Sequence, residues 1–150
     1  MQWIQKEFNQ LTARELYTLL RERVNVFVVE QNCPYPEIDD YDQDSTHLYL
    51  EDDGEVAAYC RLLPHDTIYH EASIGRILVK NKFRKQGYAK ELMKKALRIM
   101  IEDWGESEIK LHAQSHLQNF YGQYGFKTIT DEYLDDGILH VDMILQTKKK

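Results

Sequence analysis

The sequence predicts a single α/β domain, a sandwich in which a mixed central sheet is flanked by helices. Apolar runs rich in β-branched residues, which are typical of strands, alternate along the chain with amphipathic patterns that are typical of helices. The order of these patterns is β-α-β-β-β-α-β-α-β-β, and no internal repeat or linker-like stretch divides residues 1–150. A chain of this length buries about 68–70% of its unfolded surface, which is enough for one sizeable core.

The first half of the chain predicts four strands and one long helix. Thr12 and Glu15 form a capping box, and apolar residues then recur at helical spacing, so we expect a helix to begin here. Pro34 and Pro36 follow it and break the helix. The dipeptide Asp53-Gly54 is typical of a tight turn between paired strands. The predicted elements are a strand at 2–8, a helix at 12–29, and strands at 47–50, 56–63 and 71–79.

The second half begins with a long helix that starts near Gln86 and ends near Gly105. Its apolar residues share one face and its Lys and Arg residues lie outside that face, so we expect the helix to pack on the sheet. The remaining predicted elements are a strand at 109–112, a short helix at 115–124, and strands at 127–130 and 138–144, the last two joined through the sequence Asp135-Asp136-Gly137.

Composition narrows the class of protein. The net charge of −6 argues against a general nucleic-acid binder, which would show a basic face. No apolar run approaches the ~20 residues that cross a bilayer, and the first residues lack the apolar segment of a secretory signal. We therefore expect a cytoplasmic protein with no membrane partner, in which Cys33 and Cys60 are free thiols. The lysines at 148–150 are expected to form a solvated tail.

The loop between the strand ending at Val79 and the following helix predicts an anion site. The first-turn N–H groups of a helix have no partner inside the helix and point outward. Gly87 and Ala89 are small enough to let an anion approach the backbone, and Arg84 and Lys85 add positive charge. Neither G-x-G-x-x-G nor G-x-x-x-x-G-K-[ST] occurs in the chain, so the loop is not one of the better-known nucleotide fingerprints.

Arg84-x-x-Gly87-x-Ala89 resembles the [QR]-x-x-G-x-[GA] pyrophosphate loop of the GNAT N-acetyltransferases. The segment Phe120-Tyr121-x-x-Tyr124-Gly125-Phe126 resembles the F-Y-x-x-x-G-F motif that ends the same family. Residues 23–39 and 113–121 are similar to the ElaA-like branch of the family, and the resemblance covers nearly the whole chain. It implies the mixed GNAT sheet and an enzyme that uses acetyl-CoA as co-substrate.

The resemblance also assigns roles to individual residues. It implies that the backbone of the central strand runs alongside the pantetheine arm and that Tyr121 is the general acid for the departing thiolate. A phenol with a reference pKa of about 10 is a suitable donor to a thiol of about 8.5. Gln114 stands where the family commonly has Asn, and its longer amide is expected to reach the cofactor. The cofactor-binding residues implied are Ile77, Leu78, Val79, Arg84, Lys85, Gln86, Gly87, Tyr88, Ala89 and Gln114.

The general base that deprotonates the amine stays open at this stage. Glu30, Glu71, His47 and His112 are candidates by residue type, and a chain of water molecules is an alternative. Glu71 is placed first because it lies at the start of the predicted central strand, where some relatives carry a carboxylate base.

The acceptor is expected to be an amine on a small molecule or a peptide. Between Val24 and Cys60 the chain has ten Asp or Glu residues and no Lys or Arg, which suggests a negative potential that attracts a cationic amine. The alternative interpretation is a solvated acidic loop. Two other functions compete with the enzyme, namely an acyl-CoA-binding regulatory module without turnover and a nucleotide-phosphate binder. The fold class is also compatible with a homodimer formed through a terminal strand.

Two patterns suggest metal sites but do not predict one. Asp40, Asp42, Asp44 and Glu51 have the ligand spacing of a calcium loop, yet Ser45 stands where the sharp turn needs Gly, and a strand follows in place of a helix. His112 and His116 straddle a strand-to-helix junction and have no evident third ligand. No metal is therefore expected.

Overall fold

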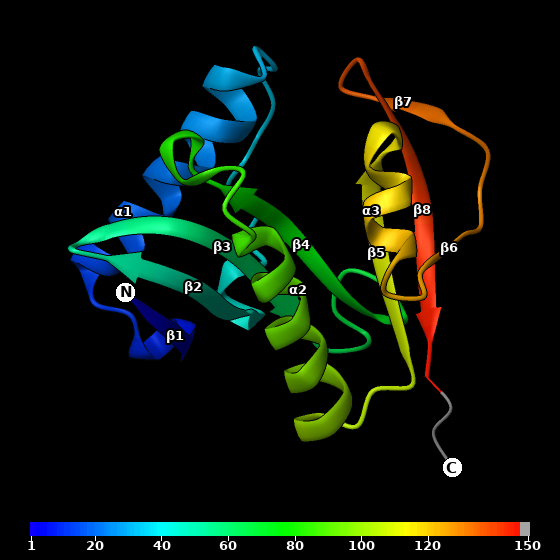
Figure 1. Ribbon diagram of the computed structural model, residues 1–150, viewed down its shortest axis with the longest axis horizontal. Helices are drawn as coiled ribbons and strands as arrows, with labels where there is room; N and C mark the ends of the chain where they lie inside the picture. Colours follow the sequence, from blue (N-terminus) through cyan, green and yellow to red (C-terminus); the bar gives the residue numbers. More distant parts are fainter. Residues whose placement is uncertain (148–150) are drawn as a thin grey trace.

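The computed structural model describes residues 1–147 and contains one mixed sheet with helices on both faces (Figure 1). The sheet order is β1-β2-β3-β4-β5-β8-β6, with β7 also paired to β8. All neighbours are antiparallel except β4 and β5. The strands are β1 Gln2–Glu7, β2 Thr46–Asp52, β3 Glu55–Leu63, β4 Ala72–Val79, β5 Glu108–Gln114, β6 Lys127–Thr128, β7 Tyr133–Asp135 and β8 Ile138–Gln146. The α-helices are α1 Ala13–Val24, α2 Tyr88–Arg98 and α3 Gln118–Gly122.

The predicted elements are present, with three differences. The helices expected at 12–29 and from Gln86 to Gly105 each end in a π-helical turn, Asn25–Glu30 after α1 and Ile99–Asp103 after α2. A 3₁₀ turn, Ser115–Leu117, precedes α3. The sequence Asp135-Asp136-Gly137 joins β7 to β8, not the strand at 127–130 to β8 as expected. The three-residue β7 was not predicted because it has too few residues to show an alternating pattern. The lysines expected to form a tail, 148–150, lie outside the described residues.

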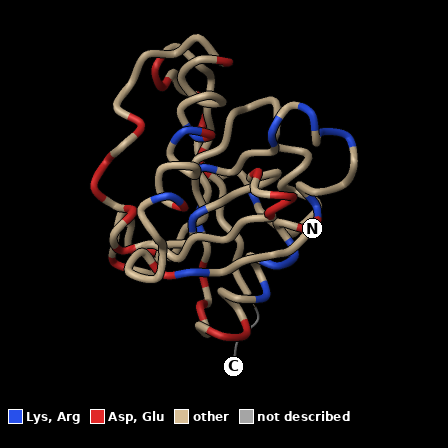
Figure 2. The backbone as a smooth tube through the Cα atoms, turned by 90° about the vertical axis from the view of Figure 1, so that its left-hand side faces the viewer, with Lys and Arg blue, Asp and Glu red and all other residues tan. Residues whose placement is uncertain are grey.

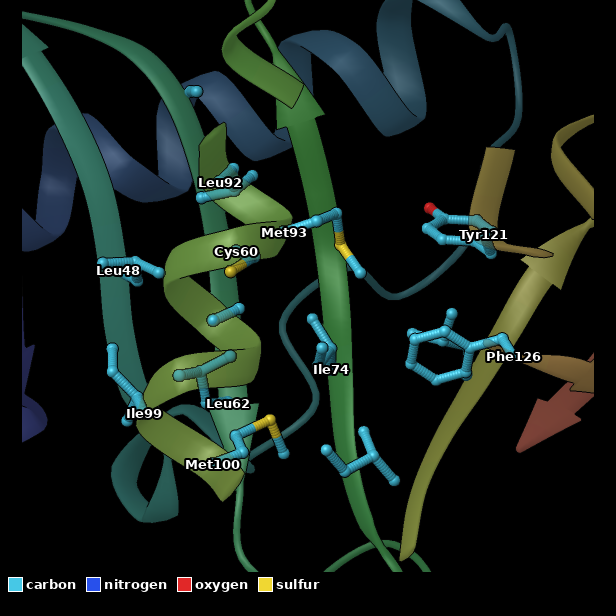
Figure 3. Close-up of a cluster of buried hydrophobic side chains, with 14 of the residues drawn as sticks. Leu48, Cys60, Leu62, Ile74, Leu92, Met93, Ile99, Met100, Tyr121 and Phe126 are labelled. Atoms are coloured by element: carbon cyan, nitrogen blue, oxygen red, sulfur yellow. The ribbon is translucent and has the colours of Figure 1, made fainter. Parts of the chain in front are cut away.

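The core lies on both faces of the sheet. The larger cluster fills the space between α2 and β2–β5, and Figure 3 shows its side chains reaching from α2 to the sheet and on to α3. Leu92, Met93 and Ala96 of α2 are fully buried, as the helical spacing predicts. A smaller cluster under α1 contains Leu19 and Tyr59. No helix in residues 1–147 combines the length and apolar character needed to cross a membrane.

The sheet opens between β4 and β5. These two parallel strands pair only at their beginning, Ala72 with Ile109 and Ser73 with Lys110. Beyond Ser73 they diverge, and the gap is visible at the centre of Figure 1. Arg76 has a positive φ of 54°, and the register between β3 and β4 shifts between Tyr59 and Arg61. β4 therefore carries a bulge after Gly75, just beyond the point where it parts from β5. The edge of β4 that faces β5 thus keeps peptide groups available to a ligand.

Candidate active site

A single cavity of about 560 Å³ passes through the gap between β4 and β5. At one end it reaches Arg84 and Ala89, beside the first turn of α2. Its walls come from the second half of β4 and of β5 and from α3, and its other end is bounded by the turn between β7 and β8. Ala113, Val141 and Tyr121 belong to the core on the α2 face. His112 and His140 alternate with core residues along β5 and β8, so they lie on the opposite face. The cavity therefore connects the two faces of the sheet.

The α2 end of the cavity has the geometry of an anion site. Gly87 is the N-cap of α2 with a left-handed φ of 86°, and a Cβ added there would meet no atom within 4 Å. The first backbone bond across it runs from the Glu91 N–H to the Gly87 oxygen at 3.2 Å. The N–H groups before Glu91 have no preceding turn to bond to, because α2 begins at Tyr88. An open space bounded by unpaired N–H groups at a helix start fits a diphosphate.

Arg84 closes this end of the cavity by a contact that the sequence did not reveal. Its Nε donates to the Val79 carbonyl oxygen at 2.8 Å, and its two terminal nitrogens lie 2.6 and 3.0 Å from the carboxylate oxygens of Glu30. Arg84 thereby ties the end of β4 to the segment after α1. Glu30, a candidate base by residue type, is engaged in this bidentate pair.

Seven of the residues implied by the resemblance lie together on the cavity wall: Ile77, Leu78, Val79, Arg84, Ala89, Gln114 and Tyr121. Lys85, Gln86, Gly87 and Tyr88 form the loop beside it but do not line it. The Tyr88 side chain turns toward the N-terminus, where its hydroxyl donates to the Met1 sulfur at 3.2 Å. The Tyr88 side chain is therefore directed away from the cavity.

Tyr121 is 5% exposed and packs edge-on against Phe120 and Phe126. Figure 3 shows its hydroxyl directed from α3 toward β4. No residue among 1–147 hydrogen-bonds this hydroxyl, although Tyr121 lines the cavity. Burial, assisted by the neighbouring Cys60 thiol, raises the pKa of Tyr121 above its ordinary value. The phenol thus keeps its proton at neutral pH and is available as a donor.

The candidate bases are separated by the structure. Glu71 directly precedes β4, next to the end where β4 and β5 are still paired, and it does not line the cavity. His47 is fully buried away from the cavity, between the Tyr59 hydroxyl at 2.6 Å and the Asp42 carbonyl oxygen at 3.0 Å. His112 does line the cavity. Of the four residues proposed by type, only Glu30 and His112 reach it.

His112 belongs to a polar cluster that was not predicted from the sequence. Its Nε2 lies 2.7 Å from Asp135 and its Nδ1 lies 3.3 Å from Asp142 and 2.6 Å from the Tyr133 hydroxyl. The ring of His140 stacks on it, with centroids 4.5 Å apart and planes inclined by 10°. The strand register explains this grouping, because His112 is opposite Asp142 and Tyr133 is opposite His140. The alternation of apolar and polar residues along the predicted strand 138–144 could have indicated this cluster, since it places His140 and Asp142 on the same face of the strand.

The same cluster contains the closest approach to a metal site in residues 1–147. One ligand atom each from His112, Asp135 and His140 lie within 4.8 Å of one another. Imidazole binds a metal ion in the plane of its ring, and two nearly parallel stacked rings do not share such a point. His116, the partner considered from the sequence spacing, is not part of this group.

The acidic stretch after α1 is largely neutralised in the folded protein. Glu37, Asp39 and Asp42 accept hydrogen bonds from three arginines that come from separate elements, Arg23 of α1, Arg61 of β3 and Arg76 of β4. Arg23 and Arg61 are each 1% exposed. In Figure 2, acidic positions follow one another along the connection at the left, and basic positions lie on other segments of the chain. Because these carboxylates are paired with arginines, residues 37–44 offer much less negative charge to an acceptor than their sequence suggests. Asp42, which belongs to the calcium-loop pattern, is bonded to Arg23 and Arg61 and is not available as a calcium ligand.

Acid is expected to weaken this cluster. Burial alone would raise the pKa of Asp39, but hydrogen bonds and charge from Arg61, with help from Tyr41 N–H and Arg76, hold it at about 2, below its ordinary 3.8. The folded state therefore binds fewer protons, and the free energy of unfolding falls as the pH drops from about 4 toward 2. Urea unfolding at several pH values should show this fall in the wild type and a smaller one in Asp39→Asn. Equal slopes for the two proteins would contradict the assignment.

Comparison with known proteins identifies the class that this fold and cavity define. A family model described as "Acetyltransferase (GNAT) domain" matches residues 12–147, and the chain belongs to this family of acyltransferases. Within the family it is similar to Protein ElaA of Escherichia coli, with 39% identity over 145 residues and 95% of both chains covered.

Two solved structures share the fold closely. The crystal structure of Escherichia coli ElaA superposes with a TM-score of 0.90 and 36% identity, covering 97% of this chain and 100% of that one. An acyl-CoA N-acyltransferase from Pseudomonas aeruginosa superposes with a TM-score of 0.91 and 40% identity, covering 97% and 99% of the two chains. The predicted fold class and family are confirmed.

Proposed function

We propose that the protein is an acetyl-CoA-dependent N-acetyltransferase in which an amine attacks the thioester directly within a ternary complex. One observation carries the proposal: a single cavity joins the start of α2, the open edge of β4 and the Tyr121 hydroxyl. An extended cofactor could place its diphosphate at the start of α2, its middle along the edge of β4, and its thioester near the Tyr121 hydroxyl. The family is one of acetyltransferases, and the similar Pseudomonas aeruginosa protein is an acyl-CoA N-acyltransferase, which supports acyl transfer from a CoA thioester.

Each stage of the reaction has a group in the cavity wall. The N–H groups at the start of α2 hold the diphosphate, and the backbone of Ile77–Val79 runs beside the pantetheine arm. A backbone N–H of the same strand polarises the thioester carbonyl as charge develops on its oxygen. Tyr121 gives its proton to the departing sulfur. No covalent intermediate is required, because the amine is itself the nucleophile.

A panel of amines tests the proposal. Purified protein, acetyl-CoA and one amine at a time, with detection of the released CoA thiol, should show amine-dependent turnover and an acetylated product by mass spectrometry. Tight binding of acetyl-CoA with no turnover on any amine would favour the regulatory acyl-CoA-binding module. Stronger competition by ATP than by phosphate-free pantetheine would favour a nucleotide-phosphate binder.

Gly87→Ala is expected to raise the KM for acetyl-CoA by about tenfold or more, because its methyl group would occupy the space in front of the N–H groups. The left-handed backbone adds a stability loss of about 1–2 kcal/mol. Steady-state kinetics and urea unfolding measure the two effects separately.

Gly54→Ala is the matched control for this prediction. Gly54 has a φ of 82°, also with no atom within 4 Å of an added Cβ, but it lies in the β2–β3 turn and not at the cavity. It should show a similar stability loss with an unchanged KM. A KM that rises equally in both variants would mean that strain alone explains the result.

A further inference from the structure

His140 of β8 presents an unused ring nitrogen to the cavity. Its Nδ1 lies 2.8 Å from the carbonyl oxygen of Ile138. A carbonyl oxygen can only accept a hydrogen bond, so Nδ1 carries the proton and Nε2 carries the lone pair. No residue among 1–147 hydrogen-bonds Nε2, and His140 is part of the cavity wall. This residue was not among the bases predicted from the sequence.

The surroundings hold His140 in this orientation. Its ring stacks on His112, whose Nε2 faces Asp135 and whose Nδ1 faces Tyr133 and Asp142. Both nitrogens of His112 are thus engaged, whereas Nε2 of His140 keeps a free lone pair. His116 also lines the cavity, but from the 3₁₀ turn before α3 and outside the cluster that orients His140. Lys110 is the nearby cation, 3.5 Å from the second oxygen of Asp142. His140 therefore has a fixed tautomer and a fixed ring plane.

The cavity also places His140 opposite the proposed acid. Tyr121 belongs to the core on the α2 face, whereas His140 lies on the other face of the sheet, and the gap between β4 and β5 connects them. A thioester held in that gap would have its sulfur toward one group and its incoming nucleophile toward the other. Asp135 and Asp136 line the cavity on the His140 side. Their carboxylates favour an acceptor that arrives with a positive charge.

We propose that His140 Nε2 is the general base and that the acceptor is a protonated aliphatic amine that enters past Asp135 and Asp136. This inference rests on the proposed function. The ammonium nitrogen gives one proton to His140 Nε2, which passes it to solvent, and the neutral nitrogen then forms the C–N bond as the C–S bond breaks. Tyr121 gives its proton to the sulfur. The second proton, which the nitrogen loses as it becomes an amide, goes to solvent, and solvent returns a proton to the Tyr121 phenolate.

Two acceptor substrates of the same shape but different charge show whether His140 acts as a base or has only a structural role. n-Butylamine is a cation at neutral pH, whereas its isostere O-propylhydroxylamine is neutral and has no such proton to lose. His140→Gln should lower kcat/KM for n-butylamine by about 10²-fold or more and for O-propylhydroxylamine by less than about tenfold. His70→Gln, whose side chain is 83% exposed in the loop before β4, is the control and should change neither value. An equal loss for both acceptors in His140→Gln would overturn the assignment.

A measurement on the wild type covers the case in which the variant does not fold or no amine is acetylated. Long-range ¹H–¹⁵N NMR of the imidazoles should show His140 with its proton on Nδ1 at neutral pH. A proton on Nε2 would overturn the proposal by itself, because that nitrogen could not then accept. Failure of all amines, by contrast, would count against the acetyltransferase function, so the two failures are distinguishable.

Discussion

Replacing Tyr121 by Phe is expected to lower kcat by about 10²–10⁴-fold and to leave the Kd for acetyl-CoA essentially unchanged. The substitution removes one oxygen that forms no hydrogen bond with residues 1–147, so the packing against Phe120 and Phe126 is retained. The departing thiolate then has no nearby donor. Steady-state kinetics and a calorimetric titration with acetyl-CoA measure the two quantities.

Tyr124→Phe is the control for this substitution. Tyr124 lies two residues after the end of α3 and packs edge-on against Phe120, but it does not line the cavity. Removing its hydroxyl should leave turnover and binding as in the wild type. Wild-type turnover in Tyr121→Phe would remove this residue from the reaction, whatever its place on the cavity wall.

Arg23→Met is expected to lower the free energy of unfolding by about 3–5 kcal/mol. The Arg23 side chain fills a buried site, with Nε 2.7 Å from Glu37 and one terminal nitrogen 2.6 Å from Asp42. Methionine approximates its aliphatic part but leaves both carboxylates with one cation fewer in a site that water does not reach. Since a domain is typically stable by only about 5–15 kcal/mol, the loss is a large share of the total.

Arg21→Met, on the same helix, is the matched control. Arg21 is 53% exposed on its side chain, and its nearest partner, Glu22, is 3.6 Å away. The half-exposed Arg21 guanidinium is screened by water, and Lys80 at 3.1 Å remains as the closer cation for the buried Glu22 carboxylate, so urea unfolding should hardly change. A similar loss of unfolding free energy in Arg23→Met and Arg21→Met would show that burial of the ion pairs of Arg23 does not determine how much they stabilise the protein.

The parts of the fold that depend on local sequence were predictable. The Asp53-Gly54 turn was recognised from its residue types, and both residues have the positive φ that such a turn requires. The loop at Gly87 was recognised because a small residue before a helix lets an anion approach the backbone, and the structure adds that Gly87 has a left-handed φ of 86°.

The parts that depend on pairing between distant segments were not predictable. His140 meets His112 only through the register of β8 on β5, and a single sequence does not give that register. Arg23, Arg61 and Arg76 lie far apart in the chain, so their joint neutralisation of Glu37, Asp39 and Asp42 could not be inferred from charge counts. The sequence left open whether the acidic stretch forms a negative acceptor site or a solvated loop. In the structure, three of its carboxylates are paired with arginines.

The divergence of β4 and β5 has a mechanical consequence. Direct backbone pairing between β1–β4 and β5–β8 is limited to two residue pairs, so the halves of the sheet are held together mainly by side chains. A pantetheine arm bound along β4 would fill the gap between β4 and β5 and restrict the relative motion of the two halves of the sheet. Part of the free energy of cofactor binding would then appear as resistance of the whole domain to denaturation, because the ligand binds only the folded chain.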